Sequence, residues 1–161
     1  MKPDTAVIDW SARGGMTNRV AVNAPSRAEL LDDLETRLAQ GRGFTVATLN
    51  LDHLVKLERD PAFRDAYLAQ SHVTADGNPV VWLSGLAGRR IELVTGSDLV
   101  LPVVQAAARR GVPVALLGAT PAVLDAAAQA LCEAVPGLSV VARIAPCLLY
   151  TSDAADEGLG V

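Results

Sequence analysis

Short apolar runs alternate with helix-forming segments along most of the chain, and this alternation constrains the fold more than any other feature. Each run is rich in Val, Leu, Ile or Ala and is bounded by turn-forming residues, which is typical of a strand. The predicted strands cover 19–23, 44–49, 71–75, 91–95, 112–117 and 138–142. Strands that alternate with helices form mostly parallel sheets flanked by helices. The sequence therefore predicts a Rossmann-like α/β domain.

Helix-start signals support this order of elements. Ser26 and Glu29 form a capping box before a helix that runs to about Gln40. Thr120 followed by Pro121 is a strong helix start, because proline suits the first helical turn. Further helices are predicted after Asn50 or Asp52, over 62–70, from Gly77 to about Leu86, and from Ser97 or Asp98 to Arg110. The expected core positions include Leu30, Leu34, Phe63, Ala66, Tyr67, Trp82 and Cys132.

The chain carries little net charge. Its 161 residues include 14 basic and 18 acidic side chains, which gives a formal net charge of −4. Asp153, Asp156 and Glu157 lie in a C-terminal stretch of unusual sequence, and without them 15 acidic residues stand against 14 basic ones. Nucleic-acid binding requires clustered positive charge, so no nucleic-acid partner is expected.

The two ends of the chain differ from the α/β pattern between them. Residues 1–17 are interpreted as a loose leader, 18–146 as the α/β domain and 147–161 as a non-native tail. The tail resembles a translated sequencing adapter, so we expect the natural protein to continue beyond Pro146. The sequence shows no signal peptide and no apolar run of about 20 residues, which favours a cytoplasmic location.

Asp76 follows the predicted strand 71–75 and directly precedes Gly77. Open α/β sheets bind ligands at the carboxyl ends of their strands, and a desolvated carboxylate there can accept a proton from a hydroxyl. Asp-Gly is also a common turn pair, because aspartate bonds its own backbone and glycine permits positive φ. Local sequence leaves Asp76 as either a general base or a turn residue.

Thr48 and Asn50 mark the end of the preceding strand and allow two interpretations as well. In the first, two short polar side chains at a strand's carboxyl end orient a sugar or its phosphate. In the second, Asn50 caps the helix that follows.

Two further segments could contact an anion. Thr95, Gly96, Ser97 and Asp98 either let backbone N–H groups approach a ligand or serve only as a capping loop. Gly118 ends the most convincing strand just before a helix start, where free N–H groups and the helix dipole suit a diphosphate.

Familiar cofactor motifs do not occur in the sequence, which contains no G-x-G-x-x-G, no Walker loop and no D-x-D pair. His53 and His72 have no Cys or carboxylate partner at ligand spacing, so each is expected at the surface or a helix end. Cys132 and Cys147 form neither a metal-ligand spacing nor a disulfide framework. No metal and no cofactor are therefore expected.

Several ordered segments together resemble one family. They are Thr48-Leu49-Asn50, Phe63-Arg64, Ala75-Asp76-Gly77 with Val80-Val81-Trp82, Val94 to Leu99, and Leu116-Leu117-Gly118. In this order and spacing they are similar to the WecG/TagA/CpsF glycosyltransferases of the N-acetylmannosaminyltransferase type. The resemblance covers roughly residues 19–146.

This resemblance implies an inverting, metal-independent transferase with a Rossmann-like fold. Such enzymes move a sugar from a UDP-sugar, often UDP-N-acetylmannosamine, to a polyprenyl-diphosphate-linked acceptor in cell-envelope or exopolysaccharide synthesis. By resemblance, Asp76 is the general base that deprotonates the acceptor hydroxyl, and Thr48 and Asn50 line the same pocket. The complete enzyme would be peripheral to the inner face of the plasma membrane.

Two departures from the family pattern limit what the resemblance implies. The family usually has an arginine directly before its Val-Thr-Gly segment, where this chain has Leu93. Arg89 or Arg90 is the candidate replacement, although solvated surface arginines are more frequent than phosphate ligands. The basic C-terminal appendage of the family is also missing, so this chain is expected to fold without necessarily being active.

The alternative function is a non-catalytic or degenerate nucleotide-binding module, and the missing phosphate fingerprint disfavours a dinucleotide oxidoreductase. A sheet edge left open beyond Ala142 would favour self-association, so a homo-oligomer is among the expected partners.

Overall fold

The computed structural model describes residues 20–146, which divide into two compact units, one up to Val103 and one from Val104. The helices are α1 (Arg27–Ala39), α2 (Leu51–Arg59), α3 (Pro61–Leu68), α4 (Asn78–Leu86), α5 (Gly96–Arg109) and α6 (Pro121–Ala134). The strands are β1 (Val46–Leu49), β2 (His72–Ala75), β3 (Val114–Leu117) and β4 (Val140–Ile144). The predicted leader and tail, 1–17 and 147–161, lie outside the described residues.

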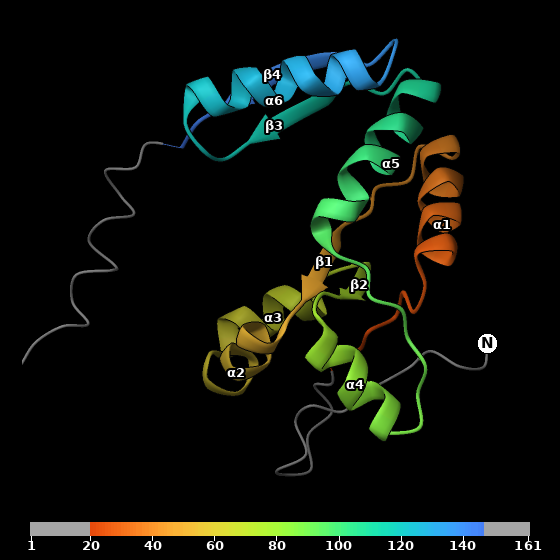
Figure 1. The fold of residues 1–161 in the computed structure, drawn as a ribbon, viewed down its shortest axis with the longest axis vertical. Helices are drawn as coiled ribbons and strands as arrows, with labels where there is room; N and C mark the ends of the chain where they lie inside the picture. Colours follow the sequence, from red (N-terminus) through yellow and green to blue (C-terminus); the bar gives the residue numbers. More distant parts are fainter. Residues whose placement is uncertain (1–19, 147–161) are drawn as a thin grey trace, which may run out of the picture. The chain divides into compact units, whose positions relative to one another are not determined.

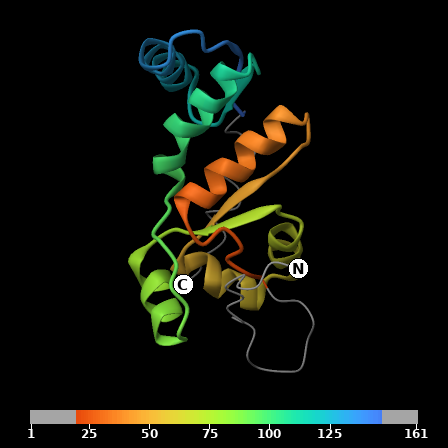
Figure 2. The ribbon, with the colours of Figure 1, turned by 90° about the vertical axis from the view of Figure 1, so that its right-hand side faces the viewer.

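The first unit is built around a parallel pair of strands, β1 and β2. Their register places Thr48 beside Thr74 and Leu49 beside Ala75, so both strands end at the same edge. α1 lies on one side of this pair and α2 and α3 lie on the other (Figure 1, Figure 2). Helices on both faces of parallel strands confirm the predicted Rossmann-like α/β class.

Each face of the β1–β2 pair packs against its own set of apolar side chains. On the α1 side, Leu30 and Leu34 are each 1% exposed and cluster with Val94 and Leu99. On the opposite side the buried cluster contains Val22, Leu49, Leu54, Leu57, Tyr67, Val73, Ala75 and Val80. Successive side chains of a strand point to opposite faces, which is why the neighbouring β1 residues Val46 and Ala47 pack against different clusters.

Two predicted strands of the first unit do not form ladders. In the segment predicted as strand 19–23, the side chain of Asn23 donates to the Ser71 carbonyl and accepts from the Val73 N–H. The next residue, Ala24, adds one backbone bond, from its N–H to the Val73 carbonyl at 3.2 Å. In the segment 91–95, Leu93 makes only one isolated parallel bridge, to Ala75. The single sheet expected from the sequence is therefore reduced to two short parallel pairs in the described chain.

Most of the predicted helix starts are confirmed. The side chains of Ser26, Asn50 and Thr120 cap α1, α2 and α6, and Pro121 occupies the first turn of α6. The prediction that Ser97 or Asp98 caps α5 is wrong. α5 begins one residue earlier, at Gly96, and the Thr95 hydroxyl accepts the Asp98 N–H at 3.2 Å.

The second unit contains the parallel pair β3 and β4. Val114 lies beside Val140, and an irregularity follows before Ala115 pairs with Ala142. α6 packs on this pair, as Figure 1 shows. Its core includes Val104, Val135 and Leu138.

Burial corrects several expectations for single side chains. Trp82 is 67% exposed on α4, and Ala66 and Cys132 are exposed as well, although all three were expected in the core. His72 is only 7% exposed, because it lies on β2 under α1 and not at the surface or a helix end. These errors share a cause, since an apolar pattern does not reveal which face of an element finds a partner.

Candidate active site

The carboxyl ends of β1 and β2 bring together three of the predicted site residues. The Asp76 N–H donates to the Leu49 carbonyl at 2.9 Å, so Asp76 directly follows the β1–β2 ladder. Thr48 lies within that ladder and Asn50 directly follows β1. All three residues are half-buried. The structure thus places Asp76, Thr48 and Asn50 at one edge of the same parallel pair.

The carboxylate of Asp76 is not used by the turn that contains it. Gly77 has a φ of 120° and precedes α4, which has no side-chain capping bond. Among the described residues, none forms a hydrogen bond or ion pair with the Asp76 carboxylate. An aspartate kept for turn geometry bonds nearby backbone N–H groups. The geometry therefore favours a functional role for Asp76 over the turn interpretation.

Asn50 uses only part of its hydrogen-bonding capacity within the described chain. Asn50 Oδ1 accepts the His53 N–H at 2.9 Å, so this residue does cap α2. Its amide group also carries two donors, which make no bond to the described part of the chain. The methyl group of Thr48 lies near Gly96, where an added Cβ would be 3.6 Å away. The start of α5 therefore lies close to the end of β1.

Sequence reasoning missed two residues beside this site, His53 and Tyr67. The Tyr67 hydroxyl donates to the Thr48 carbonyl at 2.7 Å, and it lies 2.7 Å from His53 Nδ1. Burial raises the pKa of the Tyr67 phenol, and the negative charge of Asp76 raises that pKa further. Tyr67 was expected only as a core residue. The signal that could have identified it is that a buried tyrosine hydroxyl requires a partner.

The predicted anion-binding run at the start of α5 bonds largely to itself. Thr95 Oγ1 donates to Asp98 Oδ2 at 2.7 Å and lies 2.9 Å from Ser97 Oγ. Together with the Asp98 N–H, these contacts form a capping loop. The backbone of Gly96 remains next to Thr48.

Gly118 belongs to the second unit and already has a role in the ladder there. Its N–H donates to the Ile144 carbonyl at 3.0 Å, and its φ of 122° requires glycine. That N–H is consequently occupied and not free for a diphosphate. Ala119, which follows, also has a positive φ, of 55°.

Metal-ligand geometry is not found in the described part of the chain, where no three His, Cys, Asp or Glu side chains are arranged to hold an ion. His53 and His72 both have hydrogen-bond partners within the first unit. Leu93, at the position of the family arginine, is 42% exposed.

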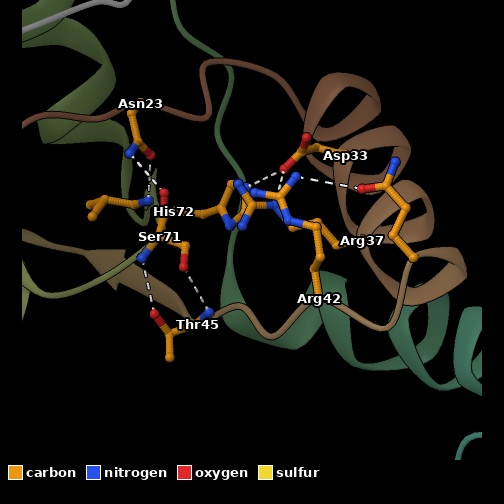
Figure 3. A network of polar contacts seen from close by, with 9 residues as sticks. Asn23, Asp33, Arg37, Arg42, Thr45, Ser71 and His72 are labelled. Carbon is orange, nitrogen blue, oxygen red and sulfur yellow. Dashed lines mark hydrogen bonds and ion pairs between the residues drawn. The ribbon is translucent and has the colours of Figure 1, made fainter.

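A second polar network lies at the opposite end of β2 and is structural. His72 Nε2 lies 2.8 Å from Asp33 Oδ2, and Arg37 Nε donates to the same oxygen at 2.6 Å (Figure 3). Thr45 and Ser71 exchange two bonds beside it, from each N–H to the other's hydroxyl. The hydrogen bond from Arg37, and then that from His72, lowers the pKa of Asp33. This network joins α1 to the amino end of the pair.

In the described chain, the parallel strands β1 and β2 end beside a half-buried carboxylate that has no partner there. This arrangement is consistent with the class of open α/β proteins, which bind ligands at the carboxyl ends of their strands. The sequence model of the glycosyl transferase WecG/TagA/CpsF family matches residues 17–159. The chain therefore belongs to the WecG/TagA/CpsF family of glycosyltransferases, which act in cell-envelope polysaccharide biosynthesis. A search of curated proteins finds no match.

The matched range includes residues 147–159, so the non-native origin of that stretch stays a prediction. In the described chain, each helix is too short or too polar to cross a membrane.

Proposed function

We propose that this chain carries the site of an inverting transferase that moves a hexosyl group from a UDP-sugar to a polyprenyl-diphosphate-linked acceptor. UDP-N-acetylmannosamine is the first donor to test. Family membership supports a nucleotide-sugar donor and a lipid-linked acceptor in general. The complete enzyme would work without a metal, as a peripheral protein at the inner face of the plasma membrane.

The observation that carries the proposal is the position of Asp76 at the edge where β1 and β2 end, with a carboxylate that has no partner among the described residues. In the proposed reaction this carboxylate takes the proton of the acceptor hydroxyl. The hydroxyl oxygen forms a bond to the anomeric carbon while the bond from that carbon to the UDP oxygen breaks. Inversion follows because the nucleophile and the leaving group occupy opposite faces of the sugar.

The surrounding residues would orient the two substrates. The amide donors of Asn50 and the hydroxyl of Thr48 would bind sugar hydroxyl or phosphate oxygens. Gly96 leaves backbone close to Thr48, which favours an anion near the start of α5. We retain Thr95, Ser97 and Asp98 as proposed contacts, and Arg89 or Arg90 as the group that balances the diphosphate charge.

Substitution of Asp76 by asparagine tests the assignment. A general base contributes about 10²- to 10⁴-fold to rate, so we expect Asp76→Asn to lose sugar transfer by that factor while UDP binding persists. Transfer is measured as product formed from UDP-N-acetylmannosamine and a polyprenyl-diphosphate-linked sugar, and UDP binding by calorimetry. Asp32→Asn makes the same chemical change at an exposed position on α1 and should retain the original rate.

Full activity of Asp76→Asn would exclude the base assignment. UDP binding without transfer by the unsubstituted chain would instead favour the nucleotide-binding module.

A further inference from the structure

The carbonyl of Thr48 points away from β2. Successive carbonyls of a strand point to opposite edges, and the Thr45 and Leu49 carbonyls accept N–H groups of the β2 side at 3.0 and 2.9 Å. The Thr48 carbonyl therefore lies on the outer edge of β1, where the described chain supplies no further strand. An unpaired edge carbonyl requires other donors.

Side chains of α2 and α3 supply those donors. Tyr67 Oη lies 2.7 Å and His53 Nδ1 lies 3.1 Å from the Thr48 oxygen, and the two side-chain atoms lie 2.7 Å from each other. The carbonyl only accepts, and the phenol has a single hydrogen. All three contacts are favourable when the Tyr67 O–H points to Thr48 and the His53 proton is on Nδ1. In this tautomer the other ring nitrogen, Nε2, carries no proton.

The same histidine also holds the other polar residue of this strand end. Its backbone N–H donates to Asn50 Oδ1 at 2.9 Å, while its ring contacts the Thr48 carbonyl. Phe63 supports the ring, with centroids 5.6 Å from His53 and 5.1 Å from Tyr67. Tyr67 is only 8% exposed, so the hydroxyl is held in place by packing.

We propose that His53 and Tyr67 are positioning residues, which hold Thr48 and Asn50 at the end of β1 in a fixed arrangement relative to Asp76. This inference rests on the proposed function for its kinetic consequence. Neither side chain needs to touch substrate. Small misplacements of orienting groups are costly, because an error of about 1 Å can reduce rate by about 100-fold.

Tyr67→Phe removes one hydroxyl and keeps the ring. We expect kcat for sugar transfer to fall by about 10- to 100-fold, because the site loses alignment, while the affinity for UDP changes less than about two-fold. His53→Ala should behave similarly. His53→Asn keeps an N–H donor close to the position of Nδ1 and should recover part of the loss.

Ser71→Ala is the matched control. The Ser71 hydroxyl accepts the Thr45 N–H at 3.2 Å at the amino end of the β1–β2 pair, so its removal also deletes one hydroxyl-to-backbone bond, at the end of the pair opposite Asp76. It should leave kcat unchanged. Wild-type kcat in Tyr67→Phe, or an equal loss of kcat in Ser71→Ala, would overturn the positioning role.

Nuclear magnetic resonance separates this inference from the proposed function. In the unsubstituted chain the ¹⁵N shifts of His53 should show a protonated Nδ1, and Tyr67→Phe should shift the amide signals of Thr48, Asn50 and Asp76. An unprotonated Nδ1, or unmoved amide signals, would contradict the positioning role even in a chain without transfer activity. Lack of transfer with the expected spectra would count only against the proposed reaction.

Discussion

At the residue scale, the site depends on how one glycine directs the chain at the end of β2. Gly77 has a φ of 120°, in a region that side-chain-bearing residues rarely adopt, and it separates Asp76 from α4. Within the described chain, the Asp76 side chain makes no helix-capping hydrogen bond. Steric space is not the limit, because a Cβ at Gly77 would only reach ordinary contact with Pro79 at 3.7 Å.

Gly77→Ala should therefore destabilise the protein through backbone strain, by about 1–3 kcal/mol, and displace Asp76. Urea unfolding measures the first effect and sugar transfer the second. Gly85→Ala is the control, since Gly85 lies inside α4 with no atom near its Cβ position, and it should stabilise by up to about 1 kcal/mol. Equal stability of the two variants would contradict the strain argument.

At the element scale, the helix with the more apolar sequence, α4, has more of its large apolar side chains exposed than α1. α1 has its leucines against the sheet, whereas α4 has Trp82, Leu83 and Leu86 exposed by 67%, 40% and 86%. α4 carries no charged residue, and its Trp82 was expected in the core. Only the packing around Val80 and Ser84 identifies its inner face.

The same substitution in the two helices tests this difference. Leu34→Ala removes a side chain that is 1% exposed and should reduce the free energy of unfolding by about 2–5 kcal/mol. Leu86→Ala removes one that is 86% exposed and should change it by less than about 0.5 kcal/mol. Thermal or urea unfolding of both variants gives the comparison. A large cost at Leu86 would mean that α4 packs against something else in solution.

At the scale of the whole molecule, polar clusters occupy both ends of the β1–β2 pair and have different tasks. The amino end holds the network of Asp33, Arg37 and His72, in which His72 Nδ1 is buried without a partner in the described chain. The carboxyl end holds Asp76, whose carboxylate has no partner among the described residues. We expect the first cluster to contribute to folding, and we propose the second for chemistry. The two can therefore be separated by the pH at which each matters.

Acid should weaken the fold through Asp33. Its pKa is lowered from the ordinary value of 3.8, first by Arg37 and then by His72, so ionised Asp33 stabilises the folded state above that value. The contribution shrinks as the pH falls below 3.8 and is lost once the pH passes below the lowered pKa. Urea unfolding at pH 7 and near pH 3 should show a smaller acid-induced loss in Asp33→Asn than in Asp65→Asn, an exposed control on α3. Equal losses in the two variants would argue against a stabilising role of ionised Asp33.

The sequence predicted the α/β class, most helix boundaries and the caps at Ser26, Asn50 and Thr120, because these depend on interactions within a few residues. It also placed Thr48, Asn50 and Asp76 at strand ends. It could not show that the Asn23 side chain would bond β2 where a strand was predicted, since that bonding depends on the edge of β2 that β1 does not pair. Nor could it tell which apolar face of α4 lies inward.

By itself, then, the sequence determined local periodicity, the capping signals and the ordered motifs that identify the family. Only the tertiary structure decided that Asp76 makes no turn bond and that Thr95 and Asp98 bond each other. It also brought Tyr67 and His53 to the Thr48 carbonyl. The physical reason is sequence separation. The hydrogen bond from the Tyr67 hydroxyl to the backbone carbonyl of Thr48, 19 residues away, depends on packing that no local pattern encodes.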